Sequence, residues 1–118
     1  MSENKKIIEK YIDGFNTSNH DLILSCLTDD VVWEMPGLFY HVGKAAFDRE
    51  IENPAFKGKP TIVITRLIEE QDVVVAEGTV QGKKKGGEPF SAVFCDVFEM
   101  KNTKIKKLIG YIAMIDNQ

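Results

Sequence analysis

Apolar and polar positions follow two different periods along this chain. Through about residue 53, most apolar side chains recur every three to four residues, which is the spacing of helices that pack by one face. From Thr61 onward they recur every second residue, which is the spacing of β-strands. The chain is therefore predicted to place its helices first and most of its sheet afterwards.

The first half carries three apolar stripes of helical spacing. The predicted helices span residues 3–15, about 20–27 and about 44–53. Between the second and third helices, residues 31–35 and 39–42 are extended pieces, separated by the turn signal Pro36-Gly37. The third helix begins after Gly43.

The second half carries four period-two segments separated by polar or glycine-rich turns. The predicted strands span residues 61–69, 72–81, 88–100 and 105–115. Helices followed by such a run of strands predict an α+β fold, with the helices packed on one face of an antiparallel meander.

The last two strands are apolar on both faces. Val93, Cys95 and Val97 alternate with Phe94 and other apolar residues, although a sheet with one wet face should alternate apolar and polar side chains. Three short helices can cover only one face. We therefore expect a homodimer built on the other, convex face of the sheet.

Length, composition and charge place the protein in an ordinary class. The 118 residues predict one domain over residues 1–118, and 43% hydrophobic with 28% charged residues is typical of a globular protein. A net charge of −3 argues against a nucleic-acid partner, which would require a basic face. No apolar run approaches the roughly 18 residues that span a bilayer, so no membrane partner is expected.

Cysteine and histidine usage argues against disulfides and metals. Cys26 and Cys95 form no C-x-x-C pair and are interpreted as reduced thiols of a cytoplasmic protein. His20 and His41 share no ligand-like spacing, so no metal site is predicted. No glycine-rich phosphate loop is present, and no cofactor is predicted.

Asp96 is the candidate functional residue that the pattern itself identifies. It shares a strand face with Phe94 and Phe98, so its carboxyl group should be desolvated and its pKa raised. A protonated carboxyl can donate a hydrogen bond, which is chemically useful. The alternative is an Asp at a strand bend or edge that reaches water or caps the backbone.

The order of elements resembles a known family. Tyr11-Ile12-Asp13-Gly14-Phe15-Asn16, His20-Asp21-Leu22 and Leu27-Thr28-Asp29-Asp30-Val31 form the most family-like stretch. Together with the helix start at Gly43 and the closing strands, they resemble the nuclear transport factor 2-like superfamily, which includes ketosteroid isomerases and SnoaL-like polyketide cyclases. The resemblance covers essentially the whole chain. It implies a cone-shaped curved sheet with three N-terminal helices on its concave face.

The ketosteroid isomerase pattern carries over only in part. Those enzymes use a Tyr on the first helix and a protonated Asp on the third meander strand as an oxyanion hole, which is also a standard worked example of a neutral carboxylic donor. Tyr11 and Asp96 match those positions. Their catalytic Asp directly before the strand-ending Pro is replaced here by Met35, which cannot accept a proton. The resemblance thus implies the donors without the usual base.

Another residue would have to act as the base. Glu34 is adjacent to Met35, but alternation directs it to the opposite side of the strand. His41 lies on the next extended piece, and His is the commonest general base near neutral pH. The alternative is that His41 is a half-exposed loop residue.

Several apolar residues are candidates for lining a ligand pocket inside the cone. They are Phe15, Trp33, Met35, Phe39, Tyr40, Phe94, Phe98 and Ile112. Their alternative role is plain core packing. A hollow cone with few polar groups would suit a small apolar molecule.

Three functions are compatible with these residues. The first is an isomerase-like or cyclase-like enzyme acting on an apolar, carbonyl-bearing molecule, with Tyr11, Asp96 and His41 as catalytic residues. The second is a non-catalytic binder of such a molecule. The third is a dimeric structural or partner-binding module whose cone is filled by side chains. The substrate and the cellular role cannot be read from the sequence.

Overall fold

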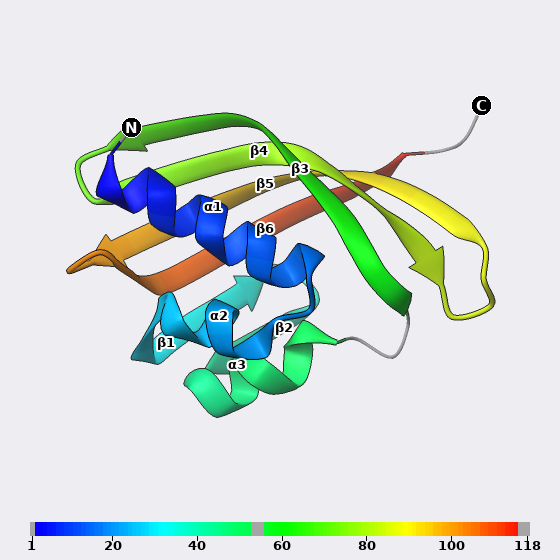
Figure 1. Cartoon of the computed structure of the whole chain (residues 1–118), viewed down its shortest axis with the longest axis horizontal. Helices are drawn as coiled ribbons and strands as arrows, with labels where there is room; N and C mark the ends of the chain where they lie inside the picture. The colour runs from blue at the N-terminus through cyan, green and yellow to red at the C-terminus, as the bar shows by residue number, and fades with distance from the viewer. Residues whose placement is uncertain (1, 53–55, 116–118) are drawn as a thin grey trace.

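A curved six-stranded sheet carries three helices on its concave side, as the computed structural model shows (Figure 1). The structure describes residues 2–52 and 56–115, with the backbone alone at residues 56 and 57. The predicted α+β class and cone-like curvature are confirmed. The sheet is mixed rather than wholly antiparallel, because one of its strand pairs is parallel.

Two of the three helices begin at polar side-chain caps, and the third begins after Gly43. The three are α1 (Glu3–Asn16), α2 (His20–Ser25) and α3 (Lys44–Ile51). The Ser2 hydroxyl accepts a hydrogen bond from the Lys5 amide at 3.1 Å, and the Asn19 side chain accepts one from the Leu22 amide at 3.1 Å. The predicted end of the third helix at residue 53 lies outside the described residues. None of the described helices has the length and apolar character needed to cross a bilayer.

The strands form one sheet in the order β2-β1-β6-β5-β4-β3. Their bounds are β1 (Leu27–Met35), β2 (Phe39–Val42), β3 (Phe56–Glu70), β4 (Val73–Lys84), β5 (Pro89–Lys101) and β6 (Lys104–Ile115). The last four make the predicted antiparallel meander. β1 runs parallel to β6 and antiparallel to β2. The sheet therefore extends beyond β6 by two strands, first β1 and then β2.

The second helix ends earlier than its apolar spacing predicts. α2 stops at Ser25, and Leu27, which we expected to be the last residue of the helix, begins β1 instead. Leu27 pairs in parallel with Ile105, both side chains are fully buried, and the Ile105 amide donates to the Cys26 carbonyl at 2.8 Å. A partner almost eighty positions away in the sequence outweighed the local helical spacing.

The hydrophobic core fills one end of the space between the helices and the sheet. Tyr11 is its aromatic centre, with ring centroids 5.5 Å from Phe98 and 6.2 Å from Phe47 in edge-to-face contacts. Ile8 and Met100 extend this core toward the start of α1. The end of the cone near the C-terminus of α1 is left open, and the candidate site lies there.

The convex face of the sheet is apolar and exposed in the single chain. Val63, Val93, Tyr111 and Ile115 are each exposed by 42% or more on this face. Arg66 and Glu77 form an ion pair beside them. An exposed patch of this kind is the feature from which the homodimer was predicted, and the dimer stays a prediction.

Candidate functional site

A two-part cavity lies between the end of α1, strand β1 and the concave face of the meander. The inner part has a volume of about 120 Å³ and the outer part about 560 Å³. The two parts share the lining residues Phe15, Trp33, Met35, Val80 and Ile112. The lining is therefore mostly apolar, with its few polar groups at the inner wall and at the mouth.

Asp96 lies on the wall of the inner part, as its strand pattern predicts. Its side chain extends from the concave face of β5, between Phe94 and Phe98, and its strand partners there are Ala76 and Gly110. Burial raises the pKa of Asp96 from 3.8 to about 7. The carboxyl group is therefore protonated in acid and half ionised near neutrality.

The Tyr11 hydroxyl faces the same inner part of the cavity. Tyr11 lines it from α1 and is only 2% exposed. Burial raises the pKa of Tyr11 well above 10.0, and the nearby charges of Asp96 and Cys26 add to the effect. Tyr11 is consequently neutral at any physiological pH. The inner wall therefore offers a phenolic donor, together with a carboxylic donor whenever Asp96 is protonated.

Met35 and Gly110 form the opposite side of the Asp96 carboxyl. A Cβ atom on Gly110 would lie 3.1 Å from Oδ1 of Asp96 and 3.5 Å from Cγ of Met35. Met35 ends β1 next to the turn at Pro36, and it lines both parts of the cavity. The Met35 side chain and the Asp96 carboxyl group therefore meet above Gly110, where neither is separated from the other by a side chain of that residue.

His41 lies at the margin of the cavity rather than in its wall. Its ring stacks on Phe39, with centroids 4.5 Å apart, and Phe39 lines the outer part. His41 Nε2 lies 2.8 Å from Oε1 of Glu50, which lines the mouth from α3. Strand pairing places His41 on the same face as Trp33 and Glu34 on the other face, as alternation predicts.

The structure gathers most of the candidate pocket residues and leaves two out. Phe15, Trp33, Met35, Phe39, Phe94 and Ile112 line the cavity. Tyr40 is 58% exposed and points away from it, since it shares a strand face with Glu34. Phe98 is fully buried against Tyr11 in the core. Tyr40 is left out because it lies on the opposite face of its strand, and Phe98 is left out because it lies deeper in the cone.

Sequence reasoning missed several residues of the cavity. Val80 and Ile62 line the inner part from β4 and β3, and Phe90 lines the outer part from β5. The period-two pattern could have predicted that Phe90 faces the cavity, because Phe90 shares a strand face with Phe94 and Phe98. Lys59 and Lys83 line the mouth. No local signal distinguishes these two lysines from the other exposed lysines of the chain.

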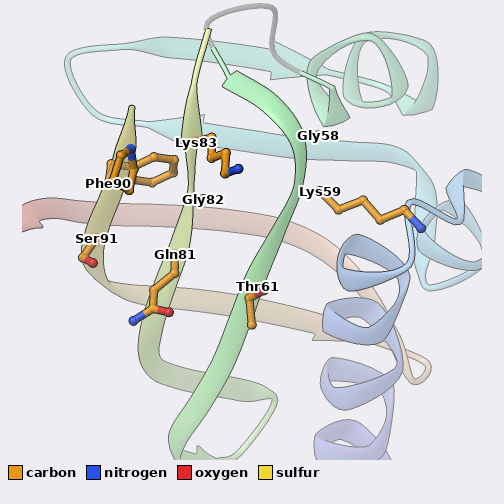
Figure 2. Close-up of a pocket in the computed structure, with 9 residues that line it drawn as sticks. Gly58, Lys59, Thr61, Gln81, Gly82, Lys83, Phe90 and Ser91 are labelled. Carbon is orange, nitrogen blue, oxygen red and sulfur yellow. The ribbon is translucent and has the colours of Figure 1, made fainter. Parts of the chain in front are cut away.

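A groove on the convex side meets the cavity at its mouth. Figure 2 shows this groove where β3 separates from β4, at the break in strand pairing between Lys57 and Thr61. Thr61, Gln81 and Ser91 line it from the convex face. Five residues border both spaces: Gly58, Lys59, Gly82, Lys83 and Phe90. The groove is shallow and open, so the apolar cavity with the two donors is the candidate site.

The described residues hold no cluster of three or more potential metal ligands. The nearest approach is His20, whose Nδ1 lies 2.6 Å from Asp48 Oδ1 and whose Nε2 lies 3.0 Å from Glu52 Oε1. The two ring nitrogens therefore face two carboxylates, one on α3 and one at its C-cap.

Comparison with known proteins identifies the family. The model of the SnoaL-like domain matches residues 8–108. No functionally curated protein matches the sequence. Among solved structures, TerC crystallised with polyporic acid aligns with a TM-score of 0.85 and 24% identity over 92% of this chain and 90% of that one.

Two further structures align over nearly the whole chain. An NTF2-like protein of unknown function from Burkholderia pseudomallei K96243 has a TM-score of 0.84 and 21% identity, over 96% of this chain and 92% of that one. An LEH-like epoxide hydrolase from M. tuberculosis has a TM-score of 0.82 and 20% identity, over 94% and 83%. Likeness at these identities establishes the fold and leaves activity open.

Proposed function

This chain belongs to the SnoaL-like domain family, and we propose that it binds an apolar, carbonyl-bearing small molecule in the cone. The carbonyl oxygen accepts hydrogen bonds from Tyr11 and from protonated Asp96. The observation that carries this proposal is the pair of neutral donors on the wall of an otherwise apolar cavity. Such a wall suits a neutral acceptor, because its apolar surroundings strengthen each hydrogen bond.

The same two donors would support isomerase-like or cyclase-like chemistry. When a proton leaves the carbon next to a carbonyl group, the developing enolate oxygen gains charge, and donors already in place stabilise it. The proton would pass to His41 or to a water molecule. His41 reaches the cavity only from its margin, through Phe39 and Glu50, so it would act on a substrate that extends to the mouth.

Met35 favours a second candidate function, a non-catalytic binder of the same ligand. It occupies the place beside the donors from which the family's base acts, and a thioether cannot take up the proton. The structural-module alternative has less support, since the cavity is hollow and carries both donors on its wall.

A homodimer through the convex face completes the proposal. The apolar residues of that face, including Val93 and Tyr111, would then be buried against a second copy. This arrangement leaves the concave side, and with it the cavity, accessible to a ligand.

The test of the binding proposal compares a naphthyl ketone with the matching alkylnaphthalene that lacks the carbonyl. Tyr11→Phe and Asp96→Leu should each weaken ketone binding by about two- to tenfold, which is the value of one hydrogen bond. Binding of the hydrocarbon should be unchanged or improved. The ¹³C resonance of a labelled carbonyl should move toward its unbonded position in both variants.

Asp96→Asn is the matched control, because an amide can still donate a hydrogen bond. It should retain most of the affinity for the ketone. Equal binding of the ketone and the hydrocarbon by the unmodified protein would rule out the carbonyl subsite. Binding of neither compound would rule out the ligand-binding function itself.

A further inference from the structure

The mouth of the cavity is electrically uneven, because its charged groups come from two different sides. Glu50 lines it from α3 and Glu52 from the C-cap of that helix, whereas Lys59 and Lys83 line it from β3 and β4. The two carboxylates and the two ammonium groups carry equal and opposite formal charge. The position and the partners of each group decide what a ligand meets on entry.

The carboxylates on the helix side already have partners. Glu50 Oε1 lies 2.8 Å from His41 Nε2, and Glu52 Oε1 lies 3.0 Å from His20 Nε2. His20 also contacts Asp48, and these hydrogen bonds raise the pKa of His20, which favours its cationic form. These contacts hold both mouth carboxylates against histidine rings of the protein.

The lysines on the sheet side differ in this respect. Among the side chains that the structure describes, none of the ion pairs joins a carboxylate to the ammonium group of Lys59 or Lys83. Figure 2 shows Lys83 extending from β4 toward β3, while Lys59 extends from β3 toward the side of α1. Both residues border the outer cavity and the convex groove, so they flank the opening through which the two spaces meet.

From this arrangement we infer that the ligand is an amphiphilic anion. Its apolar carbonyl-bearing part enters the cone, and a carboxylate or similar acidic group remains at the mouth beside Lys59 and Lys83. The inference rests on the proposed ligand-binding function and adds the charge and the orientation of the ligand. Phe90 supports this orientation, because its ring covers Gly82 between the apolar wall and the lysines.

The experiment uses two fluorescent probes with one aromatic skeleton. 1-Anilinonaphthalene-8-sulfonate carries an anionic group, and N-phenyl-1-naphthylamine does not. The Lys59→Gln/Lys83→Gln variant should bind the anionic probe about two- to tenfold more weakly, since an exposed ion pair contributes little per charge. Binding of the neutral probe should be unchanged. Raising the salt concentration should weaken the anionic probe only in the unmodified protein, because salt screens exposed charges.

The matched control is Lys84→Gln/Lys85→Gln, which removes the same amount of charge from the hairpin between β4 and β5. Both residues are exposed and neither lines the cavity. This variant should bind both probes as the unmodified protein does. An equal loss of anionic-probe affinity in the two double variants would overturn the inference, because net charge would then be the cause.

The probes also separate failure of this inference from failure of the proposed function. Phe15→Ala removes an aromatic ring from the wall shared by both cavity parts, which enlarges the cavity and should alter binding of the neutral probe. Suppose that Phe15→Ala changes binding of the neutral probe, but the Lys59→Gln/Lys83→Gln variant binds the anionic probe as the unmodified protein does. The pocket would then stand, and the inference of an anionic ligand would be overturned. If Phe15→Ala left binding of the neutral probe unchanged, the proposed ligand-binding function of the pocket would instead be rejected.

Discussion

The Cβ atom that Gly110 lacks would lie 3.1 Å from Oδ1 of Asp96. The two residues face each other across β5 and β6, on the concave side of the sheet. Because Gly110 has no side chain, the Asp96 carboxyl group has room to extend into the cavity next to Met35. A backbone position on one strand thus sets the orientation of a donor on its neighbour.

Gly110→Ala should therefore disturb the site without unfolding the protein. The added methyl group must push the Asp96 carboxyl or the Met35 side chain aside, and overpacking of this kind costs about 1–3 kcal/mol. Urea unfolding would measure the loss, and the naphthyl ketone should bind more weakly. Asp96→Ala combined with Gly110→Ala should show a non-additive effect, because Asp96→Ala removes the carboxyl group that the added methyl group would meet. Strict additivity would contradict the contact.

The protein should lose stability as pH rises from about 4 to about 7. The pKa of Asp96 is 3.8 before its shift and about 7 in the folded protein, so ionisation is opposed by folding. The contribution is complete below the unfolded value and disappears as pH rises through the folded one. Full ionisation should cost a few kcal/mol in the free energy of unfolding.

Asp96→Asn should remove this part of the pH dependence and keep the fold. The free energy of unfolding would be measured in urea at pH 5 and pH 8 for both proteins. Asp30→Asn is the matched control, because Asp30 is exposed, and it should leave the pH dependence in place. A carboxyl NMR titration that gave Asp96 an ordinary pKa would contradict both the shift and the proposed donor role.

His20 should add a second loss of folding stability as pH rises. Hydrogen bonds that His20 donates to Asp48 and Glu52 raise the pKa of His20, so the folded state favours the imidazolium. This stability is present below the unfolded pKa of His20 and is lost as pH rises through its raised folded value. In an Asp96→Asn background, Asp48→Asn should lower the His20 pKa more than Glu52→Gln does, as measured by NMR. The reverse order would contradict the shorter contact with Asp48.

Steroid isomerisation should be absent from the unmodified protein. A positioned general base contributes about two to four orders of magnitude in rate, and Met35 cannot supply it. Met35→Asp should gain measurable conversion of a 3-oxo-Δ5-steroid to its conjugated isomer, followed by ultraviolet absorbance, if the steroid fits the cavity. Met35→Asn should gain nothing. Robust turnover by the unmodified protein would show that another group acts as the base.

A charge on the convex face should weaken the proposed dimer. Val97 lies on that face between β4 and β6, so Val97→Asp would bury an uncompensated charge at the interface. Light scattering at micromolar concentration should give a dimer for the unmodified protein and a larger monomer fraction for the variant. Ser25→Asp places the same charge on exposed α2 and should leave the dimer intact. A monomeric unmodified protein would defeat the proposal.

Local pattern determined much of this protein by itself. The period-two run around Asp96 was sufficient to predict a strand, a desolvated carboxyl and its inward face, because alternation assigns each side chain to one side of a sheet. The helical stripes of α1 and α3 were equally readable, since a helix that buries one face must repeat its apolar residues every three to four positions.

Only the tertiary structure decided which of these residues meet. The strand at Leu27 exists because Ile105 pairs with it, and no local window contains both residues. Tyr40 and His41 look alike in sequence as aromatic neighbours, yet strand pairing places His41 on the cavity side and Tyr40 outside. Lys59 and Lys83 become the cationic side of one mouth because β3 separates from β4 there. Contacts between distant segments depend on the register and curvature of the whole sheet, and those are properties of the folded chain.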